Sequence, residues 1–146
     1  MPLIIVAVVL LLDQVTKSLI VKHLSLSHSQ PVIKGVLFLS LVHNRGAAFG
    51  LLKGLNIFFI LTAVAAAILI CLTLKDLGWR KITLASGALS LILAGALGNL
   101  IDRVMFGYVI DFLDLRIWPV FNVADSAISI SALLLAYSII RGRKAS

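Results

Sequence analysis

Three aspartates stand close together in the stretch VIDFLDLRIWPVFNVADS, residues 109–126. The chain has only six acidic residues, all of them aspartate, so half of its carboxylates gather here. Two carboxylates within reach of each other can share one proton, because the like charge and a low-dielectric setting raise the pKa of one of them. Such a pair can hydrolyse a peptide bond, since one acid takes a proton from water while the other donates one to the substrate.

Two polar patterns with the same spacing occur on either side of Asp111. Each contains an asparagine, an aspartate three residues later and another polar residue after that: Asn99, Asp102 and Arg103 in GNLIDR, and Asn122, Asp125 and Ser126 in FNVADS. In a helix such residues lie on one face. If both helices end at the same membrane surface, the two patterns lie at one depth, with Asp111 on the loop between them. Two simpler interpretations stay open: Asp125 can cap a helix start, and Asp102 can pair with Arg103.

Two further polar groups occur nearer the N-terminus. DQVTK places Asp13 and Lys17 four residues apart, so they can form an ion pair on one helix face, with either a structural or a catalytic role. VHNRGAAFG contains Asn44 and Arg45, followed by small residues. Arginine at this position can hold a carboxylate, a phosphate or a peptide carbonyl. It can equally extend from a helix start to the membrane surface.

The chain that carries these residues has the composition of an integral membrane protein. It is 61% hydrophobic and only 13% charged, and its mean hydropathy is +1.13. A membrane span needs about 20 mostly apolar residues, and four stretches qualify: residues 2–21, 55–74, 82–101 and 121–140. We therefore predict an all-α integral membrane protein with four transmembrane helices in a single membrane domain, residues 1–146.

The basic residues predict the orientation of these spans. The net charge is +7, and much of it lies at two span ends: Lys75, Arg80 and Lys81 in the link 75–81, and Arg141, Arg143 and Lys144 after the last span. By the positive-inside rule, both termini and the link face the cytoplasm, while loops 22–54 and 102–120 face outside. This distribution favours a membrane anchor over nucleic-acid binding. The first span lacks a basic leader and a cleavage site, so we expect it to be retained.

The first outer loop is expected to contain β-structure. The segment VIKGVLFLSLVHN is rich in Val, Ile, Leu and Phe and is broken by Gly35, which predicts a pair of short strands in a small extracytoplasmic β-sheet. A re-entrant hairpin is the alternative. Asp114 is predicted to be a solvated loop acid. The three histidines are spread apart and Cys71 is alone, so we expect neither a metal site nor a cofactor.

Five motifs occur in order across the predicted spans: DQVTK, NRGAAFG, GNLIDR, VIDF and FNVADSAI. Together they resemble lipoprotein signal peptidase, also called signal peptidase II, over essentially the whole chain. The resemblance implies an aspartic endopeptidase of the bacterial inner membrane with its active site at the outer, periplasmic face. Such an enzyme removes the signal peptide from diacylglyceryl-modified prolipoproteins, cutting just N-terminal to the lipidated cysteine. It is inhibited by globomycin-type compounds, and we expect it to be a monomer with no nucleic-acid partner.

The resemblance also implies roles for individual residues. By motif, Asp111 and Asp125 are the catalytic dyad, a choice over Asp102 that spacing alone does not make. The other matching residues correspond to supporting or substrate-binding positions: Asn44, Arg45, Asn99, Asp102, Arg103, Asn122, Asp13 and Lys17. The stretch between Asp111 and Asp125 is short for the family, so the resemblance does not imply the shape of this outer loop.

Two other functions compete with this one. A transporter or channel subunit would use its acids as a proton or cation path, and that function predicts acids spread across the depth of the membrane. Instead, four of the six acids lie near the outer ends of the third and fourth spans. A membrane scaffold would use the polar groups only for packing, and that function predicts that substitutions affect stability alone.

Overall fold

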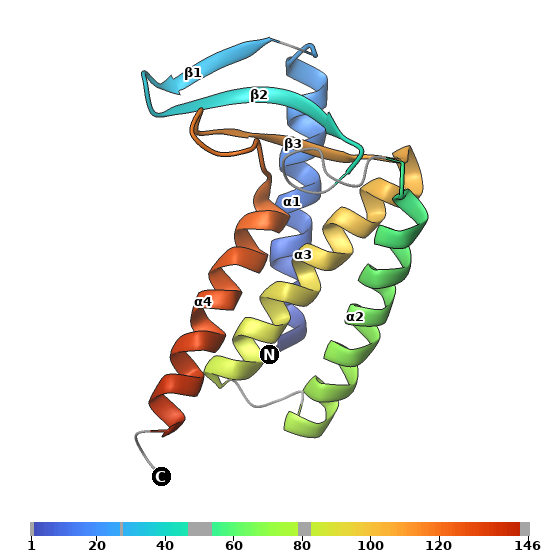
Figure 1. Ribbon diagram of the computed structural model, residues 1–146, viewed down its shortest axis with the longest axis vertical. Coiled ribbons are helices and arrows are strands. Elements are labelled where there is room, and N and C mark those ends of the chain that lie inside the picture. The colour runs from blue at the N-terminus through green and yellow to red at the C-terminus, as the bar shows by residue number, and fades with distance from the viewer. Residues whose placement is uncertain (1, 27, 47–53, 79–82, 144–146) are drawn as a thin grey trace.

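The computed structural model describes residues 2–26, 28–46, 54–78 and 83–143. Within them, four helices run alongside one another and three strands lie across one end (Figure 1). In chain order these elements are α1 (Pro2–His23), β1 (Ser29–Ile33), β2 (Leu37–Asn44), α2 (Asn56–Leu77), α3 (Leu84–Phe106), β3 (Val109–Asp114) and α4 (Val123–Arg143). Of the residues discussed above, the small residues Ala47, Ala48 and Gly50 and the basic residues Arg80, Lys81 and Lys144 lie outside the described part of the chain.

Helix α3 is the central helix of the bundle, since it packs against α1, α2 and α4. Two of its glycines lie where a side chain would not fit. A Cβ added to Gly95 would lie 2.5 Å from the carbonyl oxygen of Ala124 in α4, and one added to Gly98 would lie 2.5 Å from Oδ2 of Asp13 in α1. The glycines therefore let α1 and α4 approach α3 closely enough for polar side chains from three helices to meet.

Three of the described helices, α1, α2 and α3, are long and apolar enough to cross a membrane. They contain 22, 22 and 23 residues, and at about 1.5 Å per residue each can cross a hydrocarbon core of about 30 Å. Their outer surfaces are apolar; in α2, for example, Leu61 and Leu69 are 61% and 65% exposed. The apolar part of α4 is shorter, Val123–Ser138. Three of the four predicted spans are thus accounted for, and the fourth stays a prediction.

Two apolar clusters hold the bundle and the sheet together. The first joins α1, α2 and α3 and contains Val6, Ile70, Leu74, Leu93 and Ala94. The second joins the end of α1 to the sheet and contains Ile20, Leu24, Leu41, Ile110 and Phe112. Along α1, the buried Asp13 and Lys17 lie between the residues of these two clusters. The polar core of the protein is therefore sealed by apolar contacts on both sides along this helix.

The strands form one antiparallel sheet in the order β1-β2-β3. Strands β1 and β2 are the pair of short strands that the sequence predicts in the first outer loop, and they are antiparallel. Strand β3 is not predicted: the sequence places Asp111 on a loop, but it lies on this strand, opposite Val42 of β2. That prediction is wrong because β3 is buried along most of its length, and its residues therefore lack the alternation typical of a half-exposed strand.

The prediction that Asp114 is a solvated acid is also wrong. Asp114 ends strand β3 and is only 7% exposed. Its Oδ2 accepts a hydrogen bond from the Ser40 hydroxyl at 2.8 Å, and its Oδ1 accepts one from the backbone N–H of Arg116, also at 2.8 Å. Its carboxylate lies 3.5 Å from Nε of Arg116. Asp114 thus ties strand β2 to the loop that leads into α4.

Candidate active site

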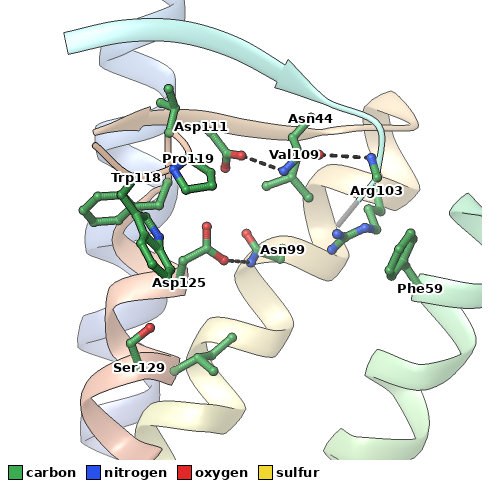
Figure 2. Close-up of a pocket in the computed structure, with 14 residues that line it drawn as sticks. Asn44, Phe59, Asn99, Arg103, Val109, Asp111, Trp118, Pro119, Asp125 and Ser129 are labelled. Atoms are coloured by element: carbon green, nitrogen blue, oxygen red, sulfur yellow. Dashed lines mark hydrogen bonds between the residues drawn. The ribbon is translucent and has the colours of Figure 1, made fainter. Parts of the chain in front are cut away.

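A cavity of about 350 Å³ lies where the sheet meets the helices (Figure 2). Its described lining comes from β2, β3, α2, α3, α4 and the loop between β3 and α4. Two carboxylates line it: Asp111 reaches it from the sheet and Asp125 from the first turn of α4. This cavity therefore brings together the two acids that the sequence predicts as a dyad.

Asp111 is held from both sides by asparagine amides. Its Oδ1 accepts a hydrogen bond from Nδ2 of Asn122 at 2.7 Å, and its Oδ2 accepts one from Nδ2 of Asn44 at 2.9 Å. The side chain is almost fully buried. Burial, and next the negative charge of Asp125, raise the pKa of Asp111 to about 7, against the opposing effects of the two amides and of Lys17. Asp111 is thus partly protonated at neutral pH.

Asp125 is fixed by a different pair of donors. Its Oδ1 accepts a hydrogen bond from Nδ2 of Asn99 at 2.8 Å, and its Oδ2 accepts one from the backbone N–H of Asn122 at 3.3 Å. In return, Oδ1 of Asn122 accepts from the backbone N–H of Asp125 at 2.9 Å. This reciprocal pairing is a helix cap of the capping-box kind. The capping interpretation of Asp125 is therefore correct, but it describes only one of the two carboxylate oxygens.

Asn122 connects the two acids. It is fully buried, and its side-chain amide donates to Asp111 while its backbone N–H donates to Asp125. The same amide also lies 3.1 Å from Oδ1 of Asn99. Because each asparagine oxygen already accepts from another group, the amide N–H groups are left to face the carboxylates. The dyad is thus oriented by neutral donors that bring no positive charge.

A separate group of charges lies behind the cavity, among α1, α3 and the start of α4. The Lys17 ammonium lies 2.8 Å from Oδ2 of Asp13 and 2.9 Å from Oδ2 of Asp102. It also donates to Oδ1 of Asn99 at 3.1 Å. Asp13 accepts a further hydrogen bond from the backbone N–H of Ala124 at 2.9 Å. The ion pair between Asp13 and Lys17 that the sequence predicts is present, and it includes a second acid.

Asp102 does not share the position of the dyad. Its Oδ1 accepts from Gln14 at 3.2 Å, and its Oδ2 accepts from the backbone N–H of Ile110 at 3.0 Å as well as pairing with Lys17. It is not among the described residues that line the cavity with Asp111 and Asp125. The partner of Asp102 is therefore Lys17, and the alternative of a simple pair with Arg103 is not what the fold contains. This geometry favours Asp111 over Asp102 as the partner of Asp125.

The remaining predicted site residues differ in their placement. Arg103 lines the cavity, and its guanidinium carbon lies 4.9 Å from the centre of the Phe59 ring (Figure 2). Asn44 also lines it, whereas Arg45 is exposed and does not belong to the described lining. The sequence does not predict Phe59 or Trp118 in this lining. The sequence could have indicated Trp118 only through its position, as an aromatic residue in a predicted outer loop. Such a position is equally typical of a residue at the membrane interface.

Comparisons with known proteins agree with these motifs. A family model described as "Signal peptidase (SPase) II" matches residues 5–141. The chain is 50% identical over 133 residues to a lipoprotein signal peptidase of Halothermothrix orenii, covering 90% of each chain. It is 47% identical over 141 residues to one of Caldanaerobacter subterraneus, covering 96% of each. A solved structure described as a bacterial membrane enzyme is similar with a TM-score of 0.89 and 35% identity, over 96% of this chain and 87% of the other.

Proposed function

Since this chain belongs to the signal peptidase II family, we propose that Asp111 and Asp125 are the residues with which it cleaves its substrate. The chain is a membrane peptidase of the aspartic type that removes signal peptides from prolipoproteins. The observation that carries the assignment of the dyad is that both carboxylates line one cavity and are held by the same asparagine, Asn122. The asparagines Asn44 and Asn99 support them from the other side.

The chemistry follows from one proton shared by two acids. The ionised carboxylate takes a proton from a water molecule, whose oxygen attacks the carbonyl carbon of the scissile bond. The protonated carboxyl donates its proton to the carbonyl oxygen, so no full negative charge develops there. When the C–N bond breaks, the leaving nitrogen takes the proton that came from water. One hydroxyl of the tetrahedral intermediate then returns its proton to the carboxylate that had donated it, so the carboxylic acid product forms and the shared proton is restored. The raised pKa of Asp111, about 7, supports this scheme because it keeps a proton available at neutral pH.

A groove beside the cavity suits the apolar helix of a signal peptide. It runs along α2, α3 and α4, and it shares Phe59, Asn99, Arg103 and Ile128 with the cavity. Farther from the dyad its lining is made of small and apolar residues: Thr62, Ala63, Ala66, Ile92 and Ala96. Small residues let a second helix pack closely within a membrane. We propose that the signal helix lies here and presents its C-terminal end to the dyad.

The finer features of the substrate and of the membrane arrangement belong to the same proposal. The substrate carries a diacylglyceryl group on its cysteine, and the cut falls just N-terminal to that residue. Helix α4 is the fourth span of a single membrane domain. α1 begins and α4 ends at the end of the bundle away from the sheet (Figure 1), which supports a cytoplasmic side there and a dyad at the outer face of the bacterial inner membrane. The enzyme acts as a monomer, and globomycin-type inhibitors occupy the cavity.

Cleavage of a lipidated precursor by the purified protein tests the dyad. We expect Asp111→Asn and Asp125→Asn each to lower turnover by at least about a thousandfold, since each removes one of two proton-transferring groups. The variants must still insert in the membrane and unfold at a temperature close to that of the wild type. A chelator in the wild-type reaction should leave the rate unchanged. Normal turnover by either variant would contradict the assignment.

A further inference from the structure

The short loop between β3 and α4 presents two large apolar residues in different ways. Ile117 is 92% exposed and does not belong to the described lining of the dyad cavity. Trp118 is 60% exposed, yet it lines that cavity together with Asp111 and Asp125 (Figure 2). Trp118 is therefore exposed at the rim of this cavity.

The position of this loop is fixed at its base and by its first residues. Leu113 and Phe121 close it with two backbone hydrogen bonds, of 2.7 and 3.0 Å. Arg116 adopts a left-handed conformation with φ of 65°, which is uncommon for a residue other than glycine. Its backbone N–H donates to Asp114 and its guanidinium lies 4.0 Å from the centre of the Phe38 ring. Trp118 is thus held at the cavity rim by its neighbours along the chain.

We propose that Trp118 is a specificity-determining residue against which an acyl chain of the lipid-modified cysteine packs. The proposal rests on the proposed function, because it takes the substrate to be diacylated next to the scissile bond. The lipid chains must then leave the cavity close to the reacting carbonyl, and Trp118 supplies an apolar wall at that exit. An indole suits this place because it combines a large apolar face with a polar N–H that tolerates the membrane boundary.

The contrast with Ile117 separates this role from simple anchoring in the bilayer. A residue that only anchors the loop faces outward, as Ile117 does. Trp118 instead lines the same cavity as Asp111 and Asp125. A substrate chain that leaves this cavity therefore contacts Trp118, whereas a residue that only anchors the loop contacts bilayer lipid. Because the chain comes from the bilayer and not from water, its gain on the ring is one of packing, and we expect a difference in binding of roughly tenfold between a chain that reaches the ring and one that does not.

The test compares two substrates of identical peptide sequence that carry either long palmitoyl chains or short acetyl chains, which have no methylene, on the glyceryl cysteine. For Trp118→Ala we expect kcat/KM for the long-chain substrate to fall by about tenfold, mainly through a higher KM. For the short-chain substrate the fall should be within about threefold. Trp118→Phe should restore most of the preference for long chains, and Ile117→Ala is the matched control that should alter neither substrate.

Three results would overturn the proposal. Trp118→Ala could lower turnover of both substrates equally, which would indicate a structural role. Trp118→Ala and Ile117→Ala could lower it equally, which would indicate a bilayer anchor. Trp118→Ala could also have no effect. Failure of the wild-type protein to cleave any lipidated precursor would instead refute the proposed function, so the two failures are distinguishable.

Discussion

Two pairs of aspartates lie in neighbouring parts of the fold, and their partners differ in kind. Asp13 and Asp102 each pair with the ammonium of Lys17, at 2.8 and 2.9 Å, and we call these three residues the ion cluster. Asp111 and Asp125, the dyad, accept hydrogen bonds from asparagine amides instead. In the part of the chain that the structure describes, neither dyad acid forms an ion pair.

The difference teaches how one residue type can serve structure or chemistry. A cation between two carboxylates attracts both of them and fixes their geometry. Neutral amides orient two carboxylates without balancing them, so the pair relieves its repulsion by keeping a proton. Asn99 joins the two regions, because it accepts from Lys17 at 3.1 Å and donates to Asp125 at 2.8 Å. Through Asn99 the ion cluster can thus hold the proposed dyad in place.

The largest effect on stability is expected from removing the cation of the ion cluster. Lys17→Met leaves two buried carboxylates without their partner, and we expect it to lower the free energy of unfolding by about 3 to 5 kcal/mol. Denaturant unfolding in detergent micelles would measure this. Asp125→Asn is the matched change in the dyad, and it should leave stability almost unchanged or raise it because it removes a like charge. Equal losses of stability in the two variants would contradict the view that the ion cluster is structural and the dyad is not.

The pH dependence of stability sharpens the same distinction. The pKa of Asp111 is about 7 in the folded protein and 3.8 in its ordinary state, so folding takes up a proton between these values. Its contribution is therefore complete below the lower value and is lost as the pH rises toward 7, by on the order of 4 kcal/mol in all. Asp111→Asn should flatten the curve of melting temperature against pH across this window. A curve as steep as that of the wild type would contradict a shared proton.

The link between the two regions gives a smaller expected effect on catalysis. In Asn99→Asp the new carboxylate can still accept from Lys17, but it replaces a donor to Asp125 with a like charge. We expect turnover to fall by about ten- to a hundredfold, in line with the loss of a hydrogen bond to a charged group. The rate should also decline at a higher pH than in the wild type, because repulsion retains the dyad proton. Asn99→Gln, which keeps an amide, should be less affected, and identical pH profiles would count against the link.

The sequence predicts the parts of this arrangement that depend on local patterns. Apolar runs locate the helices to within a few residues, and the spacing of Asp13 and Lys17 is sufficient to predict their ion pair. The identity of the dyad comes from the family resemblance, because spacing alone leaves Asp102 and Asp111 open. What separates those two acids is their partners, and the Lys17 that pairs with Asp102 lies 85 positions earlier in the chain.

Strand β3 and the burial of Asp114 depend on similarly distant contacts. The strand forms because β2 pairs with it across about 70 residues of chain, and no local alternation marks it. Asp114 is buried because Ser40 donates to it from β2. A single sequence contains no sign of that partner, and an aspartate in a predicted loop is therefore expected to be exposed to solvent. Polar residues whose partners are far apart in sequence are thus the ones that sequence patterns describe least well.

The smallest expected effect tests whether Asp114 belongs with the structural acids. If its carboxylate ties β2 to the loop before α4, Asp114→Asn weakens the hydrogen bonds from Ser40 and Arg116 and should cost about 1 to 2 kcal/mol of stability. Asp76 in α2 is exposed, so Asp76→Asn is the matched control and should stay within about 0.5 kcal/mol of the wild type. Thermal unfolding of both variants decides the question. Equal stability would mean that the hydrogen bonds of Asp114 contribute little to folding. A selective loss would place Asp114 with Asp13 and Asp102, as an acid that its partners hold for structure.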